Sequence, residues 1–211
     1  MAAPTVTKKK KTGTRVATAS PSPALSALSF ATARAFGTWL AKNHAESPGI
    51  WLKLAKKASG ARSLSYAEAV EVALAWGWID GQKRSYDEQA WLQRFSPRGA
   101  RSIWSKINRD KALRLIENGE MQPAGLAQVR AAQEDGRWQR AYDSARTAAV
   151  PGDLAAALAA NARAQRFFAT LDARNRYAIL HRLQTAKTQK TRIDRLQKFI
   201  TMLAKGERIH R

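Results

Sequence analysis

The sequence predicts an α+β protein that is mainly α-helical, with a small antiparallel β-hairpin and a helical C-terminal subdomain. Two patterns predict this class. Apolar side chains recur at steps of three and four over most of the chain, which is typical of helices. Residues 78–96 instead alternate between two faces, which is typical of strands. A chain of 211 residues suffices for one domain and a tail, or for two small domains.

The N-terminal segment, residues 1–24, is predicted to be a disordered basic tail, because Ala, Thr, Ser and Pro dominate it. It contains a run of four lysines that could bind nucleic acid: Lys8, Lys9, Lys10 and Lys11. Polar residues follow this run, where a secretory signal would need an apolar stretch. No window of the sequence approaches the roughly 18 apolar residues of a membrane span. We therefore expect a cytoplasmic protein without a transmembrane segment.

Residues 25–142 are predicted to form a helical domain around the hairpin. The first helix is expected within residues 29–43, where the apolar residues have helical spacing. A short amphipathic segment then opens at Ile50 and ends at Gly60. Ser65 and Glu68 form a capping box that begins a helix, and this helix stops near Gly77.

The hairpin is predicted from alternation in residues 78–86 and again in residues 91–96, with a turn at residues 87–89. A tighter turn at residues 80–81 is the alternative, since Asp-Gly is a common hairpin dipeptide. The later turn is favoured, because residues 82–85 are too polar to pair against the apolar residues 76–79. An isolated hairpin is only marginally stable in water, so helices must pack on it.

The rest of the chain is expected to be helical. Ser102 is predicted to cap a helix that runs to Asn118, and Pro123 begins another. Residues 143–152 are predicted to be a linker, and residues 153–207 to be the C-terminal helical subdomain. In this subdomain we expect four helices: one capped by Asp153, one over residues 164–169, one capped by Asp172 and one from about Thr191 to Gly206.

The formal net charge of +21 is spread over the whole chain. The tail carries five basic and no acidic residues, residues 25–150 carry 19 and 12, and residues 151–211 carry 13 and 4. A field of this sign attracts polyanions such as nucleic acid or anionic lipid headgroups. Because no binding motif accompanies the charge, non-specific association with nucleic acid is favoured over a dedicated nucleic-acid site.

Motifs for catalysis, metals and cofactors are not found in the sequence. It has no cysteine, no glycine-rich phosphate loop and no nucleophile elbow, and its three histidines lie far apart. We therefore assign no catalytic residue, no metal ligand and no cofactor. The remaining candidates combine flat aromatic rings with charged groups that can stack on rings and hold carboxylate or phosphate. These candidate ligand-binding residues are Trp78, Asp80, Arg84, Trp91, Arg94, Arg98 and Trp104.

The alternative for this set is structural. Tryptophans in a small domain usually fill the core, and Asp80 could simply hold a turn or pair with an arginine. Whether the set is exposed or buried is left to the structure.

Several segments together resemble the YdeI/OmpD-associated family, which is also called OmdA-like or bacteriocin-protection. The resemblance covers about residues 30–207, and it is carried by residues 71–85 (EVALAWGWIDGQKRS), 91–98 (WLQRFSPR), 104–108, 121–125, 150–161 and 186–206. The family name implies association with an outer-membrane porin and protection against bacteriocins or cationic antimicrobial peptides. No catalytic residues come with the motif. We do not expect a porin partner here, because the chain shows no signal sequence.

Three functional hypotheses follow. The first is a non-enzymatic, cytoplasmic binding or stress-protection protein, whose Trp/Arg cluster recognises an unidentified anionic partner or ligand. A chain of charge +21 repels cationic peptides, so protection would act through such a partner and not by sequestration. The second is nucleic-acid association through the basic surface and tail. The third is an unrecognised enzyme that acts on a small anionic substrate through Asp80 and neighbouring arginines.

Overall fold

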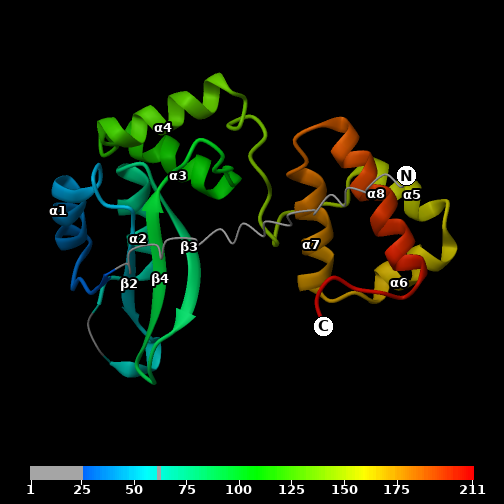
Figure 1. Cartoon of the computed structure of the whole chain (residues 1–211), viewed down its shortest axis with the longest axis horizontal. Helices are drawn as coiled ribbons and strands as arrows, with labels where there is room; N and C mark the ends of the chain where they lie inside the picture. The colour runs from blue at the N-terminus through cyan, green and yellow to red at the C-terminus, as the bar shows by residue number, and fades with distance from the viewer. Residues whose placement is uncertain (1–25, 61–62) are drawn as a thin grey trace, which may run out of the picture.

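The computed structural model describes residues 26–60 and 63–211, which form a mixed four-stranded sheet with helices packed beside it and a separate group of C-terminal helices (Figure 1). The strands β1 (Ala27–Leu28), β2 (Ile50–Ala55), β3 (Trp78–Ser85) and β4 (Ala90–Pro97) lie in the order β1-β2-β4-β3. Strand β1 runs parallel to β2, while β4 pairs antiparallel with both β2 and β3. The predicted tail with Lys8, Lys9, Lys10 and Lys11 lies outside the described residues.

The predicted fold class was wrong in its sheet. A two-stranded antiparallel hairpin was expected, whereas the hairpin of β3 and β4 is half of a mixed, four-stranded sheet. Strand β4 pairs along its length with β2, from Phe95 opposite Ile50 to Ala90 opposite Ala55. The hairpin is therefore stabilised by a third strand as well as by helices, which resolves the marginal stability of an isolated hairpin.

Strand β2 is the segment that was described only as amphipathic. Its side chains alternate along the strand, with Ile50, Leu52 and Leu54 buried and the residues between them half-buried. This period of two is the pattern of a strand with one covered face. The lysine between the last two apolar residues, Lys53, is accommodated because it points to the opposite face.

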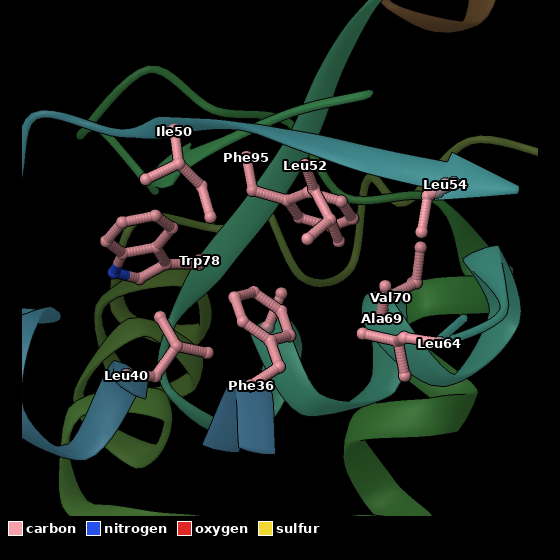
Figure 2. Close-up of a cluster of buried hydrophobic side chains, with 11 residues drawn as sticks. Phe36, Leu40, Ile50, Leu52, Leu54, Leu64, Ala69, Val70, Trp78 and Phe95 are labelled. Atoms are coloured by element: carbon pink, nitrogen blue, oxygen red, sulfur yellow. The ribbon is translucent and has the colours of Figure 1, made fainter. Parts of the chain in front are cut away.

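Helices α1 (Ala33–Asn43) and α2 (Tyr66–Ala75) cover one face of the sheet. The capping box of Ser65 and Glu68 begins α2, and Gly77 follows its end with a φ of 73° that favours glycine. A short 3-10 helix, Lys57–Ser59, follows β2. The core between helices and sheet is shown in Figure 2; it consists of Phe36, Leu40, Ile50, Leu52, Leu54, Leu64, Ala69, Val70, Ala73, Trp78 and Phe95.

A second core forms where α3 (Lys106–Glu117) and α4 (Pro123–Glu134) pack on α2. Its centre is the edge-to-face pair of Trp104 and Trp138, whose ring centroids are 4.9 Å apart. The cap of α3 is Ser105, whose Oγ accepts a hydrogen bond from the Asn108 amide at 3.1 Å. The predicted cap, Ser102, is wrong, because its hydroxyl accepts from the amide of Gly99 instead.

The C-terminal helices α5 (Gly152–Ala159), α6 (Ala162–Thr170), α7 (Ala173–Gln184) and α8 (Gln189–Ala204) enclose a third core (Figure 1). Asp172 caps α7, as its position predicts. Asp153 lies inside the first turn of α5 and accepts two hydrogen bonds from Arg192 of α8. In the described part of the chain, no helix has both the length and the apolar character that a membrane span requires.

Candidate functional site

The structure divides the seven candidate residues among four environments. Trp78 and Trp104 lie in two different cores, and each residue is 1% exposed. Trp78 also donates a hydrogen bond from Nε1 to the carbonyl oxygen of His44 at 3.1 Å. These two tryptophans hold the fold together and do not present a ring to a ligand.

Arg84 and Arg94 lie on the sheet face that points away from α1 and α2. In an antiparallel pair, directly opposed side chains share a face. Arg94 opposes Trp51, and Leu92 is opposed by Lys53 on one side and by Arg84 on the other. We call this surface the outer sheet face, and it comprises Trp51, Lys53, Arg84, Leu92 and Arg94.

Cations and rings alternate across the outer sheet face. The guanidinium carbon of Arg84 lies 4.4 Å from the centroid of the Trp51 ring. The ammonium group of Lys53 lies at the same distance from the ring of Tyr86, which is 53% exposed. The Nε atom of Arg94 is buried and has no hydrogen-bond partner within the described residues. Such a surface can stack on flat groups and pair with anions at once.

Trp91 and Asp80 lie on the other side of the sheet, at the rim of its core. The Trp91 ring is half-buried between the ammonium of Lys83, at 4.3 Å, and the ring of Tyr66, at 5.8 Å. The hydroxyl of Tyr66 donates a hydrogen bond to Oδ2 of Asp80 at 2.6 Å. Asp80 therefore joins β3 to the first turn of α2 and does not merely hold a turn.

A cleft of about 430 Å³ opens beside Asp80. Three tyrosines from distant parts of the chain line it, so we call it the tyrosine cleft: Tyr66 from α2, Tyr142 from the segment before α5, and Tyr177 from α7. Its other lining residues are Ala67, Val70, Asp80, Ser105, Ile107, Asn108, Lys111, Ser144 and Ala145.

Backbone contacts fix the wall of the cleft beside α3. The amide of Tyr142 donates to the carbonyl of Trp104 at 3.0 Å, and the amide of Lys106 donates to the carbonyl of Tyr142 at 2.8 Å. This bridge places the Tyr142 ring next to the beginning of α3. The ring of His181 packs edge-on against that of Tyr142, with centroids 4.6 Å apart.

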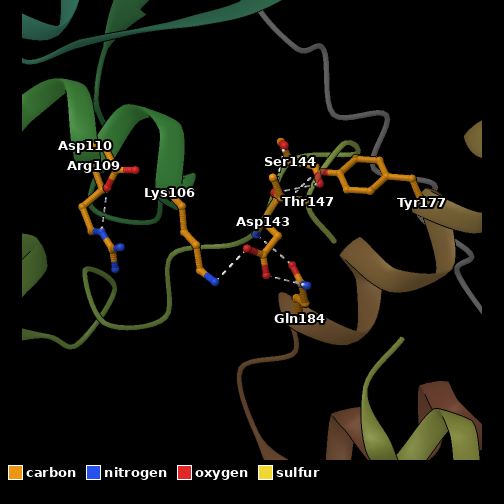
Figure 3. Close-up of polar contacts among 8 residues, drawn as sticks. All are labelled: Lys106, Arg109, Asp110, Asp143, Ser144, Thr147, Tyr177 and Gln184. Carbon is orange, nitrogen blue, oxygen red and sulfur yellow. Dashed lines mark hydrogen bonds and ion pairs between the residues drawn. The ribbon is translucent and has the colours of Figure 1, made fainter. Parts of the chain in front are cut away.

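Asp143 attaches the C-terminal helices to the rest of the chain (Figure 3). Its carboxylate pairs with Lys106 at 2.7 Å and accepts a hydrogen bond from Nε2 of Gln184 at 3.1 Å. Its amide donates to Oε1 of Gln184, and its carbonyl accepts from the hydroxyl of Tyr177 at 2.9 Å. Since Tyr177 lines the tyrosine cleft, these contacts also position that wall of the cleft.

Arg98 lies beneath the surface and is 5% exposed. Its guanidinium lies 3.8 Å from the centroid of the Trp104 ring, and its Nη1 donates to the carbonyl of Ile103 at 3.4 Å. Its Nε and Nη2 find no acceptor among the described residues. Burial lowers the pKa of Arg98 to about 10, although the charge of Asp80 acts in the opposite direction. Arg98 therefore stays charged at neutral pH.

Burial and the charge of Asp80 also perturb two of the tyrosines. Burial raises the pKa of Tyr66 far above its ordinary value. The hydrogen bond to Asp80 and the negative charge of Asp80 raise it further. Burial and then the charge of Asp80 raise the pKa of Tyr142, and Arg98 partly opposes this effect. Both phenols are therefore neutral at physiological pH.

Sequence reasoning missed the three tyrosines and Trp51 as members of a site. Tyr66 and Tyr177 lie in segments that the sequence predicts as helices, and Tyr142 lies at the boundary of the predicted linker, so none of them stood out as a candidate. No local pattern could have joined them, because the sites draw on positions up to 111 residues apart, from Tyr66 to Tyr177. Trp51 would have been found from the alternation of β2.

Two family models match the chain. Residues 147–206 match the family described as "Bacteriocin-protection, YdeI or OmpD-Associated". This C-terminal part of the chain is thus similar to the YdeI/OmpD-associated family. Residues 28–128, which include the hairpin motif, match a domain of unknown function (DUF8412). Searches of curated proteins and of solved structures found no match.

The resemblance to the YdeI/OmpD-associated family is thus confirmed for the helical segment α5–α8. The tyrosine cleft lies at the junction of the two matched segments, with Tyr66 and Asp80 in the first and Tyr177 in the second. The outer sheet face lies entirely within the first.

Proposed function

We propose that this protein is a non-enzymatic binding protein that holds single-stranded nucleic acid on its outer sheet face. The observation that carries the proposal is the stack of the Arg84 guanidinium on the Trp51 ring, 4.4 Å from its centroid, beside Arg94 and Lys53. An accessible sheet with flat groups and cations on one face offers stacking surfaces for bases and counter-ions for phosphates together.

The charge of the whole chain supports this choice of partner. At a net charge of +21, the protein attracts polyanions over a distance of about one Debye length, roughly 8 Å at physiological salt. Long-range attraction alone gives only non-specific binding. Base stacking on the protein adds about 1–3 kcal/mol of binding free energy per base. The outer sheet face supplies both terms, because the guanidinium of Arg84 lies over the Trp51 ring and the cations Lys53 and Arg94 lie on the same face.

The description of the matched family includes bacteriocin protection. If this chain has such a role, protection would act through the anionic partner. Sequestration of cationic peptides by so basic a chain is disfavoured by repulsion. We also propose a cytoplasmic location, which would bring the protein into contact with RNA. Arg94→Ala in a strain that lacks the native protein tests the link, since loss of the binding surface should also remove protection.

Fluorescence anisotropy with a labelled single-stranded oligonucleotide tests the binding directly. We expect Trp51→Ala and Arg84→Ala each to weaken binding about tenfold, the loss of one stacked base or one charged contact. The matched control is Arg163→Ala on α6, which removes an equal charge from an exposed position far along the chain. It should weaken binding by much less.

Two outcomes would overturn the proposal. If Arg163→Ala and Arg84→Ala cost the same affinity, binding follows net charge and not the outer sheet face. If a variant without residues 1–24 loses all binding while Trp51→Ala loses none, the lysine run is the binding element. A salt titration accompanies both, because released counter-ions make binding to phosphates fall steeply with salt.

A further inference from the structure

The tyrosine cleft has the composition of a site for a positively charged organic group. Asp80 supplies a carboxylate at its wall, and Tyr66, Tyr142 and Tyr177 supply aromatic rings. A ring face carries partial negative charge, so it attracts ammonium and guanidinium groups, and several rings around one carboxylate do so together. The outer sheet face has the opposite character, because cations cover its rings.

The hydrogen bond from Tyr66 uses one oxygen of Asp80, Oδ2, and holds the carboxylate in place. Asp80 remains half-buried at the cleft, where it can accept further hydrogen bonds. Lys111 is the one lysine or arginine among the lining residues of the cleft, and its ammonium group is paired with Glu71. The lysine is therefore neutralised from outside the cleft and does not occupy Asp80.

Arg98 is the charge that could cancel Asp80 from within. Its guanidinium is sealed from solvent, whereas Asp80 lines the cleft, so a ligand would touch Asp80 and remain farther from Arg98. Because Coulomb energy falls with distance, the nearer carboxylate dominates for a bound cation.

We propose that the tyrosine cleft binds the ammonium or guanidinium group of a small organic amine, with Asp80 as its counter-ion and the three tyrosine rings around it. Its volume of about 430 Å³ fits a ligand of a few carbon atoms. Its position between the segments 28–128 and 147–206 means that both parts of the chain contribute to the site. This site is separate from the outer sheet face and does not depend on nucleic-acid binding.

Agmatine is a suitable probe, because it carries an ammonium group at one end and a guanidinium group at the other. Titration of the whole protein with agmatine, followed through the tyrosine ring resonances in NMR spectra, should show saturable shifts at Tyr66, Tyr142 and Tyr177. A chain of charge +21 has no general attraction for a dication, so saturable binding reports a local site.

Asp80→Asn is the decisive variant, since the amide keeps an acceptor for Tyr66 and loses the charge. We expect it to weaken agmatine binding about tenfold or more. The matched control is Asp194→Asn on α8, an exposed carboxylate paired with Lys190, which makes the same change of charge. It should leave the affinity unchanged.

Four results would overturn the proposal: no saturable shifts with agmatine, equal binding by Asp80→Asn and the wild type, equal weakening by both variants, or equal binding of the uncharged analogue 1-pentanol. The last result would mean that the cleft selects for apolar surface and not for charge.

Tyr142→Ala provides a second check, because it removes a ring and keeps every charge. It should weaken agmatine binding, and unchanged binding would overturn the role of the rings.

Discussion

The hydroxyl of Tyr66 lies 2.6 Å from Oδ2 of Asp80, and this contact joins two residues that are 14 positions apart. It connects the first turn of α2 to strand β3 at the mouth of the tyrosine cleft. A phenol that donates to a carboxylate is stabilised in its neutral form, because ionisation would place two negative charges side by side.

Burial first, and then this hydrogen bond, should therefore make Tyr66 titrate well above the ordinary range of tyrosine. Its proton is held more tightly in the folded state, so the stabilisation is complete below the unfolded pKa of about 10 and is lost as the pH rises from there toward the folded pKa. Ultraviolet difference titration of the wild type and of Tyr66→Phe isolates this phenol. Asp80→Asn should lower its pKa. An ordinary pKa for Tyr66 in the folded protein would contradict the contact.

Trp78→Ala should destabilise the fold by about 3–5 kcal/mol, because it empties a large site in the first core and leaves the His44 carbonyl without its donor. Urea unfolding measures this free energy. Trp91→Ala is the comparison, since the Trp91 ring is half-buried and its loss exposes less of the core. Equal costs for the two variants would mean that burial does not distinguish these tryptophans. Because Trp78 is buried, any loss of binding or protection by Trp78→Ala should follow from its destabilisation of the fold.

Arg98→Met should leave the free energy of unfolding unchanged or raise it. Two nitrogens of the buried guanidinium lack acceptors in the described structure, and a buried charge of this kind is often replaced by an apolar side chain without loss. Methionine keeps the contact with the Trp104 ring. Arg98→Ala, which leaves a cavity, should destabilise the protein under the same urea titration. A large loss of stability in Arg98→Met would show that the charge itself, through its attraction to Asp80, holds the fold.

Short sequence patterns predicted the parts of the fold that depend on interactions between residues close in the sequence. The capping box at Ser65, the cap at Asp172 and the alternation of β3 and β4 depend on neighbours within a few residues. Strand β1 has only two residues, so it has no period to detect, and its pairing with β2 comes entirely from tertiary structure. The sheet was underestimated because β1 has no detectable period and because the alternation of β2 was interpreted only as an amphipathic segment.

The candidate residues could be selected by type but not sorted by environment. Trp78 and Trp91 are both tryptophans of the hairpin, yet one fills the core and the other packs at its rim. The irregular pairing between Asp80 and Lys83 changes which residues share a face, and a shift of one residue reverses every later side chain. The face on which Arg84 lies could be known only from the register.

Gly125 should be intolerant of a side chain. It lies on α4 where this helix crosses α2, and a Cβ atom at this position would come within 2.9 Å of the Ala75 carbonyl carbon and still closer to its oxygen and to the sulfur of Met121. Backbone cannot yield as a flexible side chain does, so Gly125→Ala should lower the free energy of unfolding by about 1–3 kcal/mol or more, although alanine is the better helix former.

Gly152→Ala is the matched control, because Gly152 begins α5 and a Cβ there meets no atom within 4 Å. Thermal unfolding of the two variants should show a loss for Gly125→Ala and no loss, or a gain of about 0.5–1 kcal/mol, for Gly152→Ala. Equal stability of both variants would mean that α2 and α4 do not approach each other as closely as the Gly125 contact requires.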